Sequence, residues 1–113
     1  MTTETLPTNP HFGGPGLDAL TSAHRHAIAL IQRRAIDVSL TTRDYVSVNY
    51  AGHVHELSVN ITPYAYTVPG NYRSVWQRRV ILPPSRHEDD SVEQLHEISA
   101  YLEYLRRTKR GAA

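Results

Sequence analysis

The first side chains that could do chemistry lie in Gly52-His53-Val54-His55, where one residue separates two histidines. In an extended strand, alternate side chains point to the same side, so both imidazoles could reach one metal ion. A zinc site needs three or four ligands, and the chain has no cysteine to complete the set. We therefore predict no metal and no cofactor, and expect these histidines to cap the open end of a sheet. A His-dependent metal protein is kept as an alternative.

Motifs of catalysis are missing from the sequence. It contains no Gly-x-Ser-x-Gly nucleophile elbow, no His-Glu-x-x-His metal motif, no Walker loop and no dinucleotide-binding fingerprint. The lack of cysteine also excludes a thiolate nucleophile. We expect a protein that is not an enzyme, and we predict no catalytic residues.

A second group of side chains with binding chemistry lies between Pro63 and Arg79, where tyrosine, tryptophan and arginine are crowded together. These residue types dominate the hot spots of protein interfaces, and they also stack on bases and pair with phosphates. The alternative is that the rings form cross-strand pairs that only cover a sheet. The predicted partner-binding residues are Tyr64, Tyr66, Tyr72, Arg73, Trp76, Arg78 and Arg79, with Tyr66 and Trp76 as the anchors.

The net charge favours a protein partner over a nucleic acid. Twelve Lys and Arg residues against eleven Asp and Glu residues leave a net charge of +1, which is far from the basic bias of a dedicated nucleic-acid binder. We therefore predict a protein partner. A nucleic-acid-binding regulator that uses the same hairpin and the basic tail after Leu105 is the alternative, and a steep loss of affinity with salt would identify it.

Length and composition predict one small domain. The chain has 113 residues, of which 40% are hydrophobic and 20% are charged, as in soluble globular proteins. No apolar run approaches the ~20 residues that cross a bilayer, and the first ten residues do not resemble a secretory signal. We expect a cytoplasmic protein without membrane contact. Residues 1–16, which end in Gly-Gly-Pro-Gly, are predicted to be a flexible arm, and residues 17–110 a single α+β domain.

Helical spacing of apolar residues marks the two ends of this domain. From Leu17 to Ala35 the pattern predicts a helix, and Asp18 is placed to cap it. A second helix is predicted after Asp90, with a capping box at 91–94 and basic residues near its carboxyl end. Its buried stripe is predicted to be Val92, Leu95, Ile98, Leu102 and Leu105.

Between residues 37 and 82 the apolar period changes to two, which predicts three strands of an antiparallel meander. Val38 and Leu40 already follow this period. If the chain turns at Ala51-Gly52, Tyr50 pairs with His53, and Val48 with His55. Two helices cover only one face of such a sheet, so we expect the other face to be open and to carry the rings. The two edges of the sheet leave the oligomeric state open between monomer and homodimer.

The order helix, three strands, helix is shared with double-stranded-RNA-binding domains, but the acidic run Glu88-Asp89-Asp90 stands where that family has its basic run, so we reject this match. The chain is similar instead to small phage and prophage proteins that disable host defences, the anti-CRISPR group above all. The likeness rests on size, the lack of cysteine, an aromatic meander and a capped terminal helix. It implies an inhibitor that covers a host nuclease or surveillance complex by occlusion.

Overall fold

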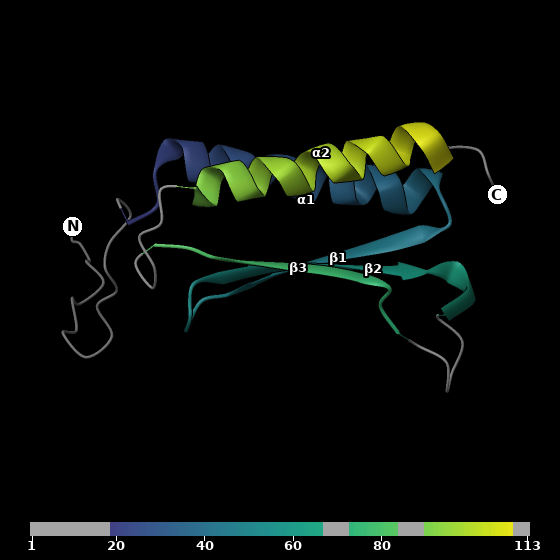
Figure 1. Cartoon of the computed structure of the whole chain (residues 1–113), viewed down its shortest axis with the longest axis horizontal. Helices are drawn as coiled ribbons and strands as arrows, with labels where there is room; N and C mark the ends of the chain where they lie inside the picture. The colour runs from purple at the N-terminus through teal and green to yellow at the C-terminus, as the bar shows by residue number, and fades with distance from the viewer. Residues whose placement is uncertain (1–18, 67–72, 84–89, 110–113) are drawn as a thin grey trace, which may run out of the picture.

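The computed structural model describes residues 19–66, 73–83 and 90–109. Its elements are α1 (Ser22–Thr41), β1 (Asp44–Ala51), β2 (Glu56–Pro63), η2 (Tyr64–Tyr66), β3 (Trp76–Ile81) and α2 (Ser91–Lys109). The strands form one antiparallel sheet in the order β1-β2-β3. Both helices lie on the same face of this sheet and run in the same direction (Figure 1). The predicted α+β order of helix, meander and helix is confirmed. The predicted arm, residues 1–16, lies outside the described residues.

The first helix begins and ends later than predicted. Thr21 caps α1 in place of Asp18: its side chain accepts a hydrogen bond from the backbone N–H of His24, and the imidazole of His24 completes the capping box. The helix then continues to Thr41, so the predicted change to an extended strand after residue 37 is wrong. Val38 follows Ile31 by two helical turns and completes the buried stripe of α1, and this packing decides the conformation there.

The β1–β2 turn is longer than predicted. Tyr50 pairs with Leu57, and Val48 with Val59, so the predicted pairing of these residues with His53 and His55 is wrong by four positions. The turn occupies residues 52–55, and His55 closes it with a positive φ of 50°. Because the shift is an even number of residues, the apolar side chains of both strands still share one face.

The hydrophobic core lies between this face and the two helices. Its apolar members are Ala27, Ile31, Ala35, Val38, Leu57, Val59, Ile61, Val80, Leu82, Leu95, Ile98, Leu102 and Leu105. Four of the five residues predicted for the stripe of α2 are among them, and Val92 is half-buried. The helical period of the second predicted helix therefore identified its buried face correctly.

An ion pair joins the end of α2 to the start of β1. The carboxylate of Asp44 is buried, and its Oδ2 lies 3.0 Å from Nζ of Lys109. This oxygen has no hydrogen-bond partner among the described residues. The ammonium of Lys109 is therefore what compensates a carboxylate that has lost its water.

Replacing Lys109 by methionine is expected to lower the free energy of unfolding by about 1–3 kcal/mol, because it leaves the buried carboxylate of Asp44 uncompensated. Urea denaturation at pH 7 measures the loss. Arg107→Met is the matched control, since Arg107 is an exposed cation on the same helical turn, and should change stability by less than about 0.5 kcal/mol. Equal losses in both variants would show that Asp44 does not need this ion pair.

Candidate protein-binding surface

The pairing of β3 decides which face its side chains occupy. Trp76 pairs with Ile61, and Arg78 with Val59. Residues paired directly across strands point to the same face, and Ile61 and Val59 are buried beneath the helices. Trp76 and Arg78 therefore lie on the helix-covered face, and the expectation that Trp76 is on the open face is wrong. This placement of Trp76 could have been predicted from the sequence, because an even number of positions separates it from Val80 and Leu82, which are buried.

At the β3 edge, Trp76 meets the aromatic side chains of α2. Its ring stacks on Tyr101, with centroids 4.9 Å apart and an interplanar angle of 26°. Tyr101 in turn lies 6.2 Å from Tyr104 at 20°. The guanidinium of Arg78 lies 5.9 Å from the centre of the Trp76 ring. We call these four residues, Arg78, Trp76, Tyr101 and Tyr104, the aromatic ladder.

The aromatic ladder extends from β3 to an exposed position on α2. Trp76 and Tyr101 are half-buried, whereas 58% of Tyr104 is exposed. Tyr104 also lines a shallow cavity of about 410 Å³ on α2, together with Ala100, Glu103, Arg107 and Thr108. The sequence analysis predicted Trp76 and Arg78 as binding residues but missed Tyr101 and Tyr104. These two tyrosines are three residues apart on a helix, a spacing that places their rings on the same side.

Carboxylates border the ladder. Glu97 lies 3.9 Å from Arg78, and both side chains are at least half exposed, so this pair adds little to stability. Glu103 accepts two hydrogen bonds from Arg106, at 2.6 and 3.0 Å. These hydrogen bonds, with the nearby charges of Arg106 and Arg34, lower the pKa of Glu103 below its usual range. Glu103 therefore stays ionised beside Tyr104 at neutral pH.

The other predicted binding residues lie elsewhere. Tyr64 forms an edge contact with Tyr45, with centroids 6.2 Å apart, and Arg43 lies 5.2 Å from its ring centre. Arg79 is on the opposite face of β3 from Trp76, and its Nη1 is 3.5 Å from Glu56. Arg73 precedes β3 and is exposed. Tyr72 and the side chain of Tyr66 lie outside the described part of the structure. The predicted single surface is therefore divided among at least three places.

The open face of the sheet is polar rather than aromatic. The middle of it presents Ser47, Asn49, Ser58, Asn60, Gln77 and Arg79, as the register of the three strands requires. Among the described strand residues of this face, Tyr45 at one end supplies the aromatic ring. Short hydroxyl and amide side chains keep such a face in water, so the expectation of a ring-rich open face is wrong.

The histidines are distributed over three environments. His53 is exposed in the β1–β2 turn, and Nδ1 of His55 lies 2.7 Å from the hydroxyl of Tyr50. Among the described residues, no three His, Asp or Glu side chains come together as metal ligands would. His24 is buried at the start of α1.

His24 is part of a hydrogen-bonded row that resembles a catalytic triad. Its Nε2 lies 2.7 Å from Oγ of Ser91, and its Nδ1 lies 2.8 Å from Oγ1 of Thr21. The backbone N–H of Thr21 also donates to Nδ1, so Nδ1 is the acceptor and Nε2 carries the proton. An imidazole in this tautomer donates to Ser91 and cannot remove its proton. Ser91 is also buried, so the row joins the two helices and does not activate a nucleophile.

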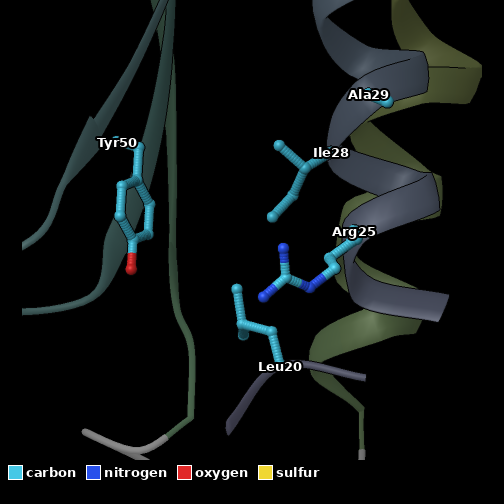
Figure 2. A pocket seen from close by; sticks show the side chains of 5 residues that line it. All are labelled: Leu20, Arg25, Ile28, Ala29 and Tyr50. Atoms are coloured by element: carbon cyan, nitrogen blue, oxygen red, sulfur yellow. The ribbon is translucent and has the colours of Figure 1, made fainter. Parts of the chain in front are cut away.

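A pocket of about 440 Å³ opens between α1 and the end of β1. Leu20, Arg25, Ile28, Ala29 and Tyr50 line it. Figure 2 shows Ile28 and the guanidinium of Arg25 extending from α1 toward the strand that carries Tyr50. Its lining is mostly apolar and lacks the several convergent polar groups typical of small-molecule sites.

The fold and its side chains define a class: a two-layer α+β protein with an aromatic ladder on the β3–α2 flank. No known protein family, no curated protein and no solved structure matches this chain. Neither described helix has the length together with the apolar character that crossing a bilayer requires.

Proposed function

We propose that this chain is a non-enzymatic module that binds a protein partner through the aromatic ladder. The observation that carries the proposal is the stack of Trp76, Tyr101 and Tyr104, which ends in an exposed tyrosine. Rings already stacked on one another lose little conformational freedom on binding, so more of their contact energy becomes affinity. Trp, Tyr and Arg are also the residue types enriched in hot spots.

The charges around the ladder favour a protein over a nucleic acid. The carboxylate of Glu97 lies 3.9 Å from the guanidinium of Arg78. The ionised Glu103 lies beside Tyr104. Carboxylates in these positions repel phosphates, whereas a protein partner can offer Lys, Arg or amide groups to them. The nucleic-acid alternative would need a basic surface around the rings, and the described residues of this flank mix both signs of charge.

The similarity to small anti-defence proteins suggests a narrower role, the occlusion of a host nuclease or surveillance complex. Occlusion needs a rigid surface with hot-spot residues and no catalytic groups. The stacked ladder on a well-packed helix is a surface of this kind. If this role is right, the chain should lower DNA cleavage by the nuclease that it binds.

Tyr104→Ala is expected to weaken binding of the partner by about 2 kcal/mol, or about 30-fold in Kd, because Tyr104 is the exposed end of the ladder. The partner is captured from a host lysate with the wild-type chain, purified, and titrated calorimetrically with each variant. Tyr45→Ala is the control, since Tyr45 is another partly exposed tyrosine on the opposite flank, and should keep the wild-type affinity.

Equal affinities of the two variants would contradict the proposal. A partner that is nucleic acid, with affinity that falls steeply between low and moderate salt, would support the alternative regulator instead. For the narrower role, the wild-type chain should inhibit the captured nuclease and Tyr104→Ala should not.

A further inference from the structure

The open face of the sheet carries a pair of tyrosines at the end where β1 begins and β2 ends. Tyr45 belongs to this face and is 39% exposed, and Tyr64, which follows β2 directly, is 50% exposed. Their ring centroids are 6.2 Å apart, and the guanidinium of Arg43 lies 5.2 Å from the ring centre of Tyr64. The backbone N–H of Tyr64 donates to the carbonyl oxygen of Arg43 at 2.8 Å, so the backbone itself holds the ring and the cation side by side.

The segment that enters β3 reaches the same end of this face. Oγ of Ser74 lies 3.4 Å from Oγ1 of Thr62, and Thr62 pairs with Tyr45 across the strands. Arg73, the residue before Ser74, is exposed, so it brings a second guanidinium to this end. We call the four residues Arg43, Tyr45, Tyr64 and Arg73 the tyrosine patch.

The charge of the open face is positive, unlike that of the aromatic ladder. Besides the two arginines of the tyrosine patch, the face carries Arg79, whose Nη1 lies 3.5 Å from the carboxylate of Glu56 on the same face. The other carboxylates in the described part of the chain are on the helix side of the sheet (Figure 1). Among the described residues, three guanidinium groups therefore stand against one carboxylate here, which favours an anionic partner.

Hydroxyl and amide groups occupy the rest of the open face. They belong to Ser47, Asn49, Ser58, Asn60 and Gln77. The core of a protein interface is enriched in aromatic side chains and methionine, and serine is depleted there. Hydroxyl and amide groups suit instead the hydrogen-bonding edges of unpaired bases and the 2′-hydroxyl of ribose. From Tyr45 to Asn49 the strand advances about 13 Å, so a nucleic-acid strand that begins on the rings passes these groups.

We propose that the open face binds single-stranded RNA, with bases stacked on the tyrosine patch and phosphates paired with its arginines. Stacking on an aromatic ring requires the flat face of a base and accepts any base. Arg43 is close enough to the ring of Tyr64 for one nucleotide to contact both. Farther along the strand, the hydroxyl and amide groups bind base edges and 2′-hydroxyls. A duplex fits poorly, because its bases are stacked on one another and leave no face for a tyrosine.

Fluorescence anisotropy of labelled oligouridine of about 12 nucleotides, titrated with the full chain, tests the proposal. Its Kd is expected to rise about 7- to 20-fold between about 50 and 200 mM salt, since each of two or three phosphate contacts adds about 0.7 to the logarithmic slope. Oligodeoxyuridine of the same length lacks only the 2′-hydroxyls and should bind at least about twofold more weakly. An RNA duplex of that length should bind at least about fivefold more weakly, because it offers no stacking.

Tyr64→Ala is expected to raise the Kd for oligouridine at least about fivefold, because it removes a stacking ring. Tyr64→Phe keeps the ring and should keep the affinity, and circular dichroism of both variants verifies that they fold. Arg43→Gln should lower the salt slope by about 0.7, the contribution of one phosphate contact. Arg33→Gln is the matched control, since it removes an exposed cation of α1 on the helix side, and should leave the slope unchanged.

Absence of binding at about 500 μM protein and about 50 mM salt overturns the proposal. Equal affinity for oligodeoxyuridine or for the duplex also overturns it, as does wild-type affinity in Tyr64→Ala. A loss of RNA binding in Tyr104→Ala would place the RNA on the aromatic ladder and would equally overturn it. Tyr64→Ala and Arg43→Gln should still bind the protein partner of the ladder, so failure here is distinct from failure of the proposed function.

Discussion

Leu102→Ala is expected to lower the free energy of unfolding by about 2–5 kcal/mol. Leu102 is fully buried in the stripe of α2 and belongs to the hydrophobic core. Its loss removes favourable burial and leaves a cavity that the surrounding helices fill only in part. For a domain with about 5–15 kcal/mol of stability, this is a large fraction of the total. Urea denaturation followed by circular dichroism measures it.

Leu40→Ala is the matched control for this substitution. The same side chain is removed from the other helix, at a position that is 79% exposed, so the expected change is below about 0.5 kcal/mol in dilute solution. The pair tests the placement of the core directly. A small loss for Leu102→Ala, or a loss of similar size at Leu40, would contradict the packing of α2 against the sheet.

The second large effect is a loss of stability on mild acidification. His24 is only 6% exposed, and burial lowers its pKa below the ordinary value of about 6.5. The unfolded chain therefore takes up a proton at a higher pH than the folded chain does. The stabilisation is complete above pH 6.5 and is lost as the pH falls from 6.5 toward the folded pKa. A protonated Nδ1 would also lose the hydrogen bonds that it accepts from Thr21.

His24→Ala is expected to cost about 1–3 kcal/mol at pH 7.5, because Ser91 and the cap of α1 lose their buried partner. The variant should also show a flatter dependence of stability on pH between 5 and 7 than the wild type. Denaturation at several pH values measures both effects. His26→Ala removes an exposed histidine two residues away and should keep the wild-type profile. An unchanged pH profile in His24→Ala would refute the role given to His24.

Local patterns were sufficient for the order of the elements. Alternating apolar residues in β1 and β2 and the helical stripe of α2 predicted the secondary structure and the buried face of each element, because burial follows the period of the backbone. The same patterns were insufficient at two places. They did not identify Thr21 as the cap of α1, and they assigned Val38 to a strand, although it belongs to the helix. Both depend on how α1 packs against the rest of the chain.

Features of this protein that depend on residues close together in the sequence could be predicted, whereas contacts between residues far apart in the sequence could not. The sequence by itself determined the α+β order, the absence of thiol chemistry, and the presence of Trp76 and Arg78 in a region rich in binding side chains. Only the tertiary structure decided that Trp76 stacks on Tyr101 and that His24 meets Ser91. A period of two assigns residues to a face but permits any even shift of register. Contacts between distant elements are chosen by the packing of the whole core, which no local pattern contains.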